Sequence, residues 1–296
     1  MKKVFNVSAD CKPNLHYMVD ISERLQKIKS LIDRGEYFTI NRARQYGKTT
    51  TLRALKKYLQ EEYLVISLDF QKLDTAKFQN GNIFSLAFAS YFSRMMRKEC
   101  TGGSGEMNVE LERLDRIVDD RPESFSLFDL FGYLSQICEI SDKPIVLMID
   151  EVDSAADNQV FLDFLAQLRS YYIDRDELSI FRSVILVGVY DIKSLKVRFR
   201  SDEEHKTNSP WNIAADFDID MSLSEQGITG MLSDYERDYH TGMDRQELAS
   251  LIYEYTSGYP FLVSRICKLI DEKIAGSPEF PDGEVAWTRE GFLAAV

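Results

Sequence analysis

The sequence has no long apolar run. No stretch approaches the roughly 18 apolar residues that a membrane-spanning helix needs. The first residues, MKKVFNVSADCK, also lack the apolar segment of a secretory signal peptide. We therefore expect neither a membrane protein nor a secreted one, and we place the chain in the cytoplasm.

Cysteine and histidine are both scarce. The four cysteines contain no C-x-x-C pair, and the three histidines are isolated from one another, so no zinc site is predicted. The thiols are best interpreted as small, reduced apolar side chains. Any metal chemistry must therefore depend on carboxylates, hydroxyls and phosphates. The cysteines are Cys11, Cys100, Cys138 and Cys267, and the histidines are His16, His205 and His240.

Positive charge is in deficit, with 36 Lys and Arg against 48 Asp and Glu, which gives a net charge of −12. This balance argues against a general grip on nucleic acid or on anionic membranes, although it is compatible with a local basic groove. Apolar residues make up 44% of the 296 residues, which is typical of a globular protein with one large or two modest domains.

Buried, β-prone runs alternate with segments of helical periodicity over the first two thirds of the chain. This alternation predicts a three-layer α/β core with a mostly parallel sheet. The expected strands are 37–41, 63–70, 144–150, 183–190 and a last candidate at 212–221. The expected helices are 21–32, 50–58, 82–97, 125–140 and 158–172, and a glycine-rich loop is expected at 100–106.

After residue 221 the pattern is helical only, with periodic segments at 224–239, 244–255 and 260–274. We therefore predict a core domain over 1–221, including the N-terminal helix, and a helical lid over 222–296. The segment from Trp287 to Val296 begins like a capped helix and ends in apolar residues, so the sequence is compatible with a further region beyond it.

A phosphate-binding loop is predicted between the first strand and the next helix. The pattern G-x-x-x-x-G-K-[ST] is filled in its second half by Gly47, Lys48 and Thr49, while Arg42 stands at the first glycine position. The backbone amides at the start of the helix would bind phosphate. Lys48 would contact the β- and γ-phosphates and assist catalysis, and the Thr49 hydroxyl would bind Mg²⁺. The nucleotide-binding residues of this loop are Arg44, Gln45, Tyr46, Gly47, Lys48, Thr49 and Thr50. A glycine turn before an ordinary capped helix is the alternative.

A second motif lies at the end of the expected strand 144–150, where Asp150 and Glu151 follow an apolar run. In an open α/β fold this places both acids at the carboxyl edge of the sheet, where ligands bind. Asp150 would hold Mg²⁺, and Glu151 would polarise the attacking water as a catalytic residue. Such strand-end acids are commonplace alone. Their combination with the phosphate loop is what indicates nucleotide binding.

With these motifs, and with the late Gly258-Tyr259-Pro260-Phe261, the sequence resembles AAA-like P-loop ATPases over roughly residues 15–275. It is similar to the signal-transduction ATPases with numerous domains, and most similar to the group called AAA-ATPase-like. The resemblance implies ATP and Mg²⁺ as ligands and a strand order of 5-1-4-3-2. It also implies a γ-phosphate sensor at Asp191 and contact of Tyr259 and Pro260 with the nucleotide base.

Three functions remain open at this point. The chain is a Mg-ATP-dependent conformational switch, a nucleotide-gated interaction module with little hydrolysis, or the ATPase half of a nuclease-linked protein. A small-molecule kinase is an outside class. No N-K-x-D tetrapeptide indicates guanine, so ATP is expected. An unknown protein partner or effector domain, and a homo-oligomer, are the partner classes considered, and nucleic acid is not expected to bind this chain.

Overall fold

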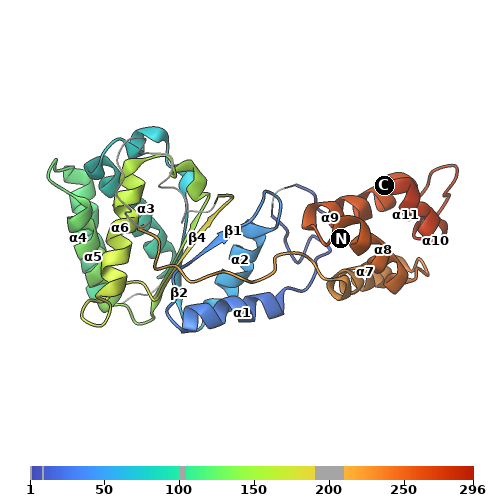
Figure 1. Ribbon diagram of the computed structural model, residues 1–296, viewed down its shortest axis with the longest axis horizontal. Coiled ribbons are helices and arrows are strands. Elements are labelled where there is room, and N and C mark those ends of the chain that lie inside the picture. Colours follow the sequence, from blue (N-terminus) through green and yellow to red (C-terminus); the bar gives the residue numbers. More distant parts are fainter. Residues whose placement is uncertain (1, 9, 101–104, 191–209) are drawn as a thin grey trace, which may run out of the picture. The chain divides into compact units, whose positions relative to one another are not determined.

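The computed structural model describes residues 2–8, 10–100, 105–190 and 210–296 (Figure 1). The chain divides into two compact units. One consists of Lys27–Arg42 and Leu55–Asp218 and contains the sheet. The other consists of Met1–Gln26, Ala43–Ala54 and Ile219–Val296 and contains the C-terminal helices. The chain passes from one to the other within α1 (Ser22–Asp33) and α2 (Lys48–Leu59).

The first unit is built on four parallel strands in the order β1-β4-β3-β2. The two central strands, β3 and β4, are buried at every position, which explains why their sequences are almost wholly apolar. The prediction of a parallel α/β sheet is thus confirmed, as is the 1-4-3-2 part of the expected order. The strands are β1 (Phe38–Asn41), β2 (Leu64–Asp69), β3 (Ile145–Asp150) and β4 (Ser183–Gly188).

The fifth strand predicted at 212–221 is not formed. Only Ala215 makes a parallel bridge, to Phe38 of β1, with its amide donating to the Tyr37 carbonyl at 2.7 Å. The segment carries Asp216, Asp218 and Asp220, and aspartate is disfavoured in strands. Besides the Ala215 bond, a side chain just before the segment holds it beside β1, since the Trp211 indole donates to Thr39 Oγ1 at 2.8 Å.

Helices pack around this sheet over an aromatic-rich core. Phe84 and Phe88 of α3 contact Phe164 of α6, with ring centroids 5.4 and 5.0 Å apart. The helices predicted at 82–97, 125–140 and 158–172 are confirmed, whereas α4 was not predicted. Of the loop expected at 100–106, residues 101–104 lie outside the described part, and Gly105 and Glu106 begin α4. The elements are η1 (Phe70–Lys72), η2 (Thr75–Phe78), α3 (Gly81–Glu99), α4 (Gly105–Asp120), α5 (Leu127–Glu139), η3 (Val152–Ser154) and α6 (Gln159–Ile173).

The second unit contains a helical bundle (Figure 1) that confirms the three predicted helical segments and the capped helix near the end of the chain. The N-terminal segment contributes to its core, because the Phe5 ring lies 5.2 Å from Tyr235 and 5.9 Å from Trp287. The elements are α7 (Glu225–Tyr239), α8 (Arg245–Thr256), α9 (Pro260–Leu269), the π-helix η5 (Ile270–Ile274), α10 (Gly283–Ala286) and α11 (Arg289–Ala295).

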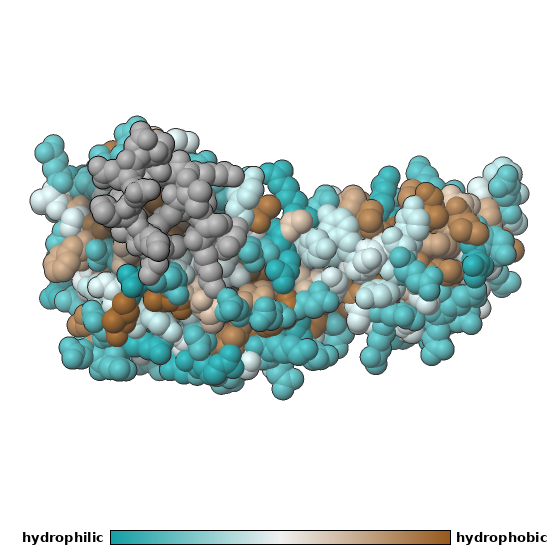
Figure 2. Space-filling model, in the orientation of Figure 1, coloured by the Kyte–Doolittle hydropathy of each residue, from teal (hydrophilic) through white to brown (hydrophobic). Residues whose placement is uncertain are grey.

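Among the described residues, no helix has the length and apolarity that crossing a membrane requires. Figure 2 shows hydrophilic residues over most of the visible face of both units, with brown patches that are small and scattered.

Candidate nucleotide-binding site

The predicted phosphate loop begins directly after β1 and ends at the first residue of α2. Gly47 has φ +73°, and no atom lies within 4 Å of the position that a Cβ would take there. Gln45 also has a left-handed backbone, with φ 63°. The Lys48 side chain folds back over the loop, and its Nζ donates to the Ala43 carbonyl at 3.1 Å. Lys48 is only 9% exposed.

This arrangement suits an anion. The first amides of a helix have no partner inside that helix, and they carry its positive dipole end. Gly47 leaves open space before them, which a phosphate oxygen can approach closely. The Thr50 hydroxyl accepts a hydrogen bond from the Cys11 amide at 3.2 Å. Its side chain therefore ties the N-terminal segment to the loop.

The turn before α9 contacts the same loop, within the same unit. The Tyr259 hydroxyl donates to the Arg44 carbonyl at 2.8 Å and lies 3.4 Å from Gln45 Oε1. The Tyr259 ring also lies 4.9 Å from the ring of Tyr46. Four residues predicted to bind nucleotide, from two distant parts of the sequence, are thus brought together.

A small cavity lies beside this contact. It has a volume of about 80 Å³ and is lined by Met18 and Val19, by Tyr46 and Gly47 of the loop, and by Pro260. Sites that enclose a whole ligand measure about 300–1,000 Å³, so this cavity accommodates only one end of a nucleotide. Its apolar lining next to the loop suits the base.

Two residues that line this cavity are held by hydrogen bonds to the C-terminal part of the same unit. Tyr17 is buried, and its hydroxyl donates to Asp238 Oδ2 at 2.7 Å; burial, followed by that hydrogen bond, raises the pKa of Tyr17. Arg24 was not singled out from the sequence, where it looks like an ordinary helix-surface charge. Its guanidinium donates to the Ser222 carbonyl at 2.9 Å, and its buried Nε has no partner among the described residues. Burial lowers the pKa of Arg24.

The predicted acids lie at the carboxyl edge of the sheet. Asp150 is the last residue of β3 and is 8% exposed, and its Oδ1 accepts a hydrogen bond from the Glu151 amide at 3.0 Å. Glu151 has a left-handed backbone with φ 55°, which ends the strand abruptly. Because β1, β4 and β3 are parallel neighbours, Asn41, Gly188 and Asp150 end at one edge of the sheet.

Asp153 joins the two segments that follow β3 and β4. Its carboxylate accepts hydrogen bonds from the amides of Val189 at 2.6 Å and Tyr190 at 3.0 Å. A Cβ on Gly188 would lie 2.9 Å from Asp153 Oδ1 and 3.0 Å from Val152 Cγ2, so this approach requires glycine. Sequence reasoning missed Asp153, although the spacing D-E-V-D would have been a signal. Asp191, the predicted sensor, lies outside the described residues.

The residues predicted to hold Mg²⁺ are single carboxylate and hydroxyl donors rather than parts of a preformed metal cage. No group of three His, Cys, Asp or Glu side chains capable of holding a metal occurs in the described part of the chain. Mg²⁺ is usually held by one or two carboxylates together with phosphates and waters. Asp150 at the sheet edge and Thr49 in the first turn of α2 are donors of this kind.

Comparisons with known proteins identify a family and similar folds. The chain matches the family described as AAA-like domain over residues 16–276. Its fold is similar to that of the Walker-type ATPase PABY2304 of Pyrococcus abyssi, with 14% identity, a TM-score of 0.57, and coverage of 91% of this chain and 71% of that one. It is also similar to the ORC2 protein of Aeropyrum pernix in its ADPNP-ADP complexes, with 10% identity, a TM-score of 0.53, and coverage of 98% and 69%.

A comparison with the curated proteins gave no match. The family match covers most of the chain and includes the phosphate loop, the acids after β3 and the helices up to η5. The chain therefore belongs to the AAA-like domain family of P-loop ATPases.

Proposed function

We propose that this chain is a Mg-ATP-dependent conformational switch. The observation that carries the proposal is the loop from Ala43 to Lys48, with open space at Gly47 and the Lys48 ammonium folded over it. ATP would place its phosphates on the amides of this loop and its base in the cavity lined by Met18, Val19 and Pro260.

Hydrolysis is assigned to the chain's own acids. Lys48 would hold the β- and γ-phosphate oxygens, and Glu151 would orient and deprotonate the attacking water. Thr49 and Asp150 would hold Mg²⁺, which, when bound, neutralises charge on the phosphates. The carboxyl ends of β1, β4 and β3 lie at one edge of the sheet, and the phosphate loop directly follows β1 in the sequence, which supports this division of roles.

The switch is assigned to the contact between Tyr259 and the loop. The Tyr259 hydroxyl binds the Arg44 carbonyl, so a change in the conformation of the loop on loss of γ-phosphate would move the start of α9. A relation to the signal-transduction ATPases is part of this proposal. The domain boundary at residue 221, the sensor role of Asp191 and the cytoplasmic location stay predictions.

The test compares nucleotide binding with turnover in the full chain. Glu151→Gln should retain ATP and lose phosphate release, while Lys48→Ala should lose binding. Glu177→Gln, an exposed acid after α6, is the matched control and should behave as the parent. Unchanged hydrolysis in Glu151→Gln would refute the catalytic assignment. Tight nucleotide binding without phosphate release in the parent would favour the nucleotide-gated module.

A further inference from the structure

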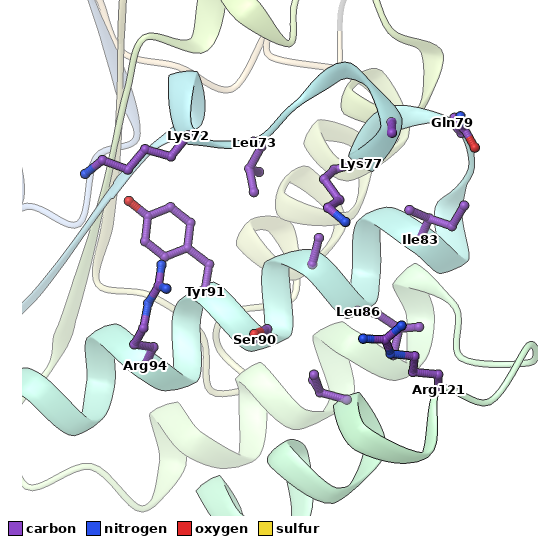
Figure 3. Close-up of a pocket in the computed structure, with 13 residues that line it drawn as sticks. Lys72, Leu73, Lys77, Gln79, Ile83, Leu86, Ser90, Tyr91, Arg94 and Arg121 are labelled. Atoms are coloured by element: carbon purple, nitrogen blue, oxygen red, sulfur yellow. The ribbon is translucent and has the colours of Figure 1, made fainter.

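A second, larger cavity lies in the unit that contains the sheet. It has a volume of about 520 Å³, within the range of ligand sites. One wall is a face of α3, where Ile83, Ala87, Tyr91 and Arg94 recur at helical spacing. The segment from η1 to η2 and the end of α4 complete it (Figure 3).

The cavity is basic although the chain has a net charge of −12. Four of its lining residues are cations, namely Lys72, Lys77, Arg94 and Arg121. Lys72 lies 3.6 Å from Asp69, and Arg94 stacks on Tyr91 with its Cζ 5.0 Å from the ring centroid. In residues 2–8, 10–100, 105–190 and 210–296, no acid forms an ion pair with Lys77, Arg94 or Arg121.

The cations are placed around an apolar floor. Figure 3 shows Lys72 and Arg94 close to Tyr91, while Lys77 and Arg121 lie on the side of Leu86 and Ile83. Arg121 has a left-handed backbone, φ 47°, directly after α4, at a position where glycine is usual. The floor consists of Leu73, Ala76, Ile83, Leu86, Ala87 and Val118.

The combination of four cations with an apolar floor favours one class of anionic ligand over another. A nucleic-acid strand is bound by cations together with free aromatic faces on which bases stack. Among the described residues that line the cavity, Tyr91 is the only aromatic one, and it is 6% exposed and has Arg94 over its ring. An apolar floor between cations instead matches a peptide whose apolar side chains are flanked by carboxylates.

We propose that this cavity is a docking site for an acidic segment of a partner protein, with leucine-like side chains on the floor and carboxylates on the four cations. Its lining shares no residue with the nucleotide loop. It adjoins the sheet edge, however, because the Asp69 amide at the end of β2 donates to the Tyr91 hydroxyl at 3.1 Å.

The test measures fluorescence anisotropy of a short fluorescein-labelled peptide of alternating glutamate and leucine with the full chain. Arg94→Glu/Arg121→Glu should weaken binding about tenfold or more, a loss of about 1.4 kcal/mol or more. The control Lys57→Glu/Lys98→Glu makes the same charge change at exposed positions outside the cavity and should stay within about twofold. Lys72→Glu/Lys77→Glu, on the other wall, provides a second variant should the first fail to fold.

Replacing leucine by serine in the probe should also weaken binding, and replacing glutamate by lysine should abolish it. Equal losses of affinity in the cavity and control variants would show that binding depends only on net charge, and would overturn the proposal. Equal affinity for the leucine and serine probes would overturn the role of the floor. Tighter, cavity-dependent binding of labelled single-stranded oligothymidine would identify a nucleic-acid site instead.

Discussion

Removing the Tyr259 hydroxyl should weaken nucleotide binding by a predictable amount. The hydroxyl holds the Arg44 carbonyl at 2.8 Å, and the ring lies 4.9 Å from Tyr46. Tyr259→Phe removes one hydrogen bond and keeps the ring contact. A bond of this kind contributes about 0.5–1.5 kcal/mol, so we expect ADP and ATP affinities to fall about two- to twelvefold. Tyr259→Ala also loses a ring contact of about 0.5–1.5 kcal/mol.

The assay is isothermal titration of the full chain with ADP and with a slowly hydrolysed ATP analogue. Tyr253→Phe is the matched control, because Tyr253 is an exposed residue of α8 that does not line the cavity, and the affinity of this variant should equal that of the parent. Unchanged affinity in Tyr259→Phe would refute the idea that this bond prepares the loop for phosphate. Tighter binding would show that the bond instead holds the loop in a form that nucleotide must displace.

Three further predictions concern the two units. Gly258→Ala should lower the free energy of unfolding by about 2–4 kcal/mol in urea titrations, because its Cβ would lie 2.1 Å from the Leu223 carbonyl oxygen at φ +70°; Gly230→Ala, where no atom lies within 4 Å, should not destabilise. Asp153→Asn should lower steady-state ATP turnover about tenfold, because the substitution weakens two charge-assisted hydrogen bonds to the segment after β4. Nucleotide affinity should change less than about twofold. Equal turnover in Asp153→Asn and in the exposed control Asp157→Asn would contradict this role of Asp153. Burial opposes ionisation of Glu236, but bonds from Thr241 and Gly242 outweigh it and lower its pKa. The stability it adds is therefore present above its unfolded pKa near 4.5 and lost as the pH falls through the lower folded value, so Glu236→Gln should destabilise by about 2 kcal/mol at neutral pH and progressively less in acid.

The parts of the fold that the sequence predicts are those with a strong local pattern. The strands β3 and β4 are apolar at nearly every position because both faces of the central sheet are covered, and no helical pattern competes with such a run. The phosphate loop was predictable for a similar reason. A left-handed backbone at Gly47 and a helix starting at Lys48 are local requirements, and residues adjacent in the sequence meet them.

The parts that were missed depend on contacts distant in the sequence. The segment after Trp211 looked like a strand, but its aspartates disfavour one. The indole bond to Thr39 and the Ala215 amide bond to the Tyr37 carbonyl hold it beside β1 instead. Arg24 looks like a surface charge until the chain folds it against the Ser222 carbonyl. The basic cavity brings together η1, η2, α3 and α4, and the last of these was not predicted at all.

Asp153 connects the acids that follow β3 to the segment that follows β4. Its carboxylate binds the Val189 and Tyr190 amides, and Gly188 is the residue that allows it to come so close. A shift of the segment after β3 must therefore either carry Val189 with it or break two bonds to an ionised group. Glu151 lies two residues from Asp153, so the orientation of the proposed catalytic acid depends on that segment. This dependence predicts that substitutions in the segment after β4 change the rate of hydrolysis more strongly than they change nucleotide affinity.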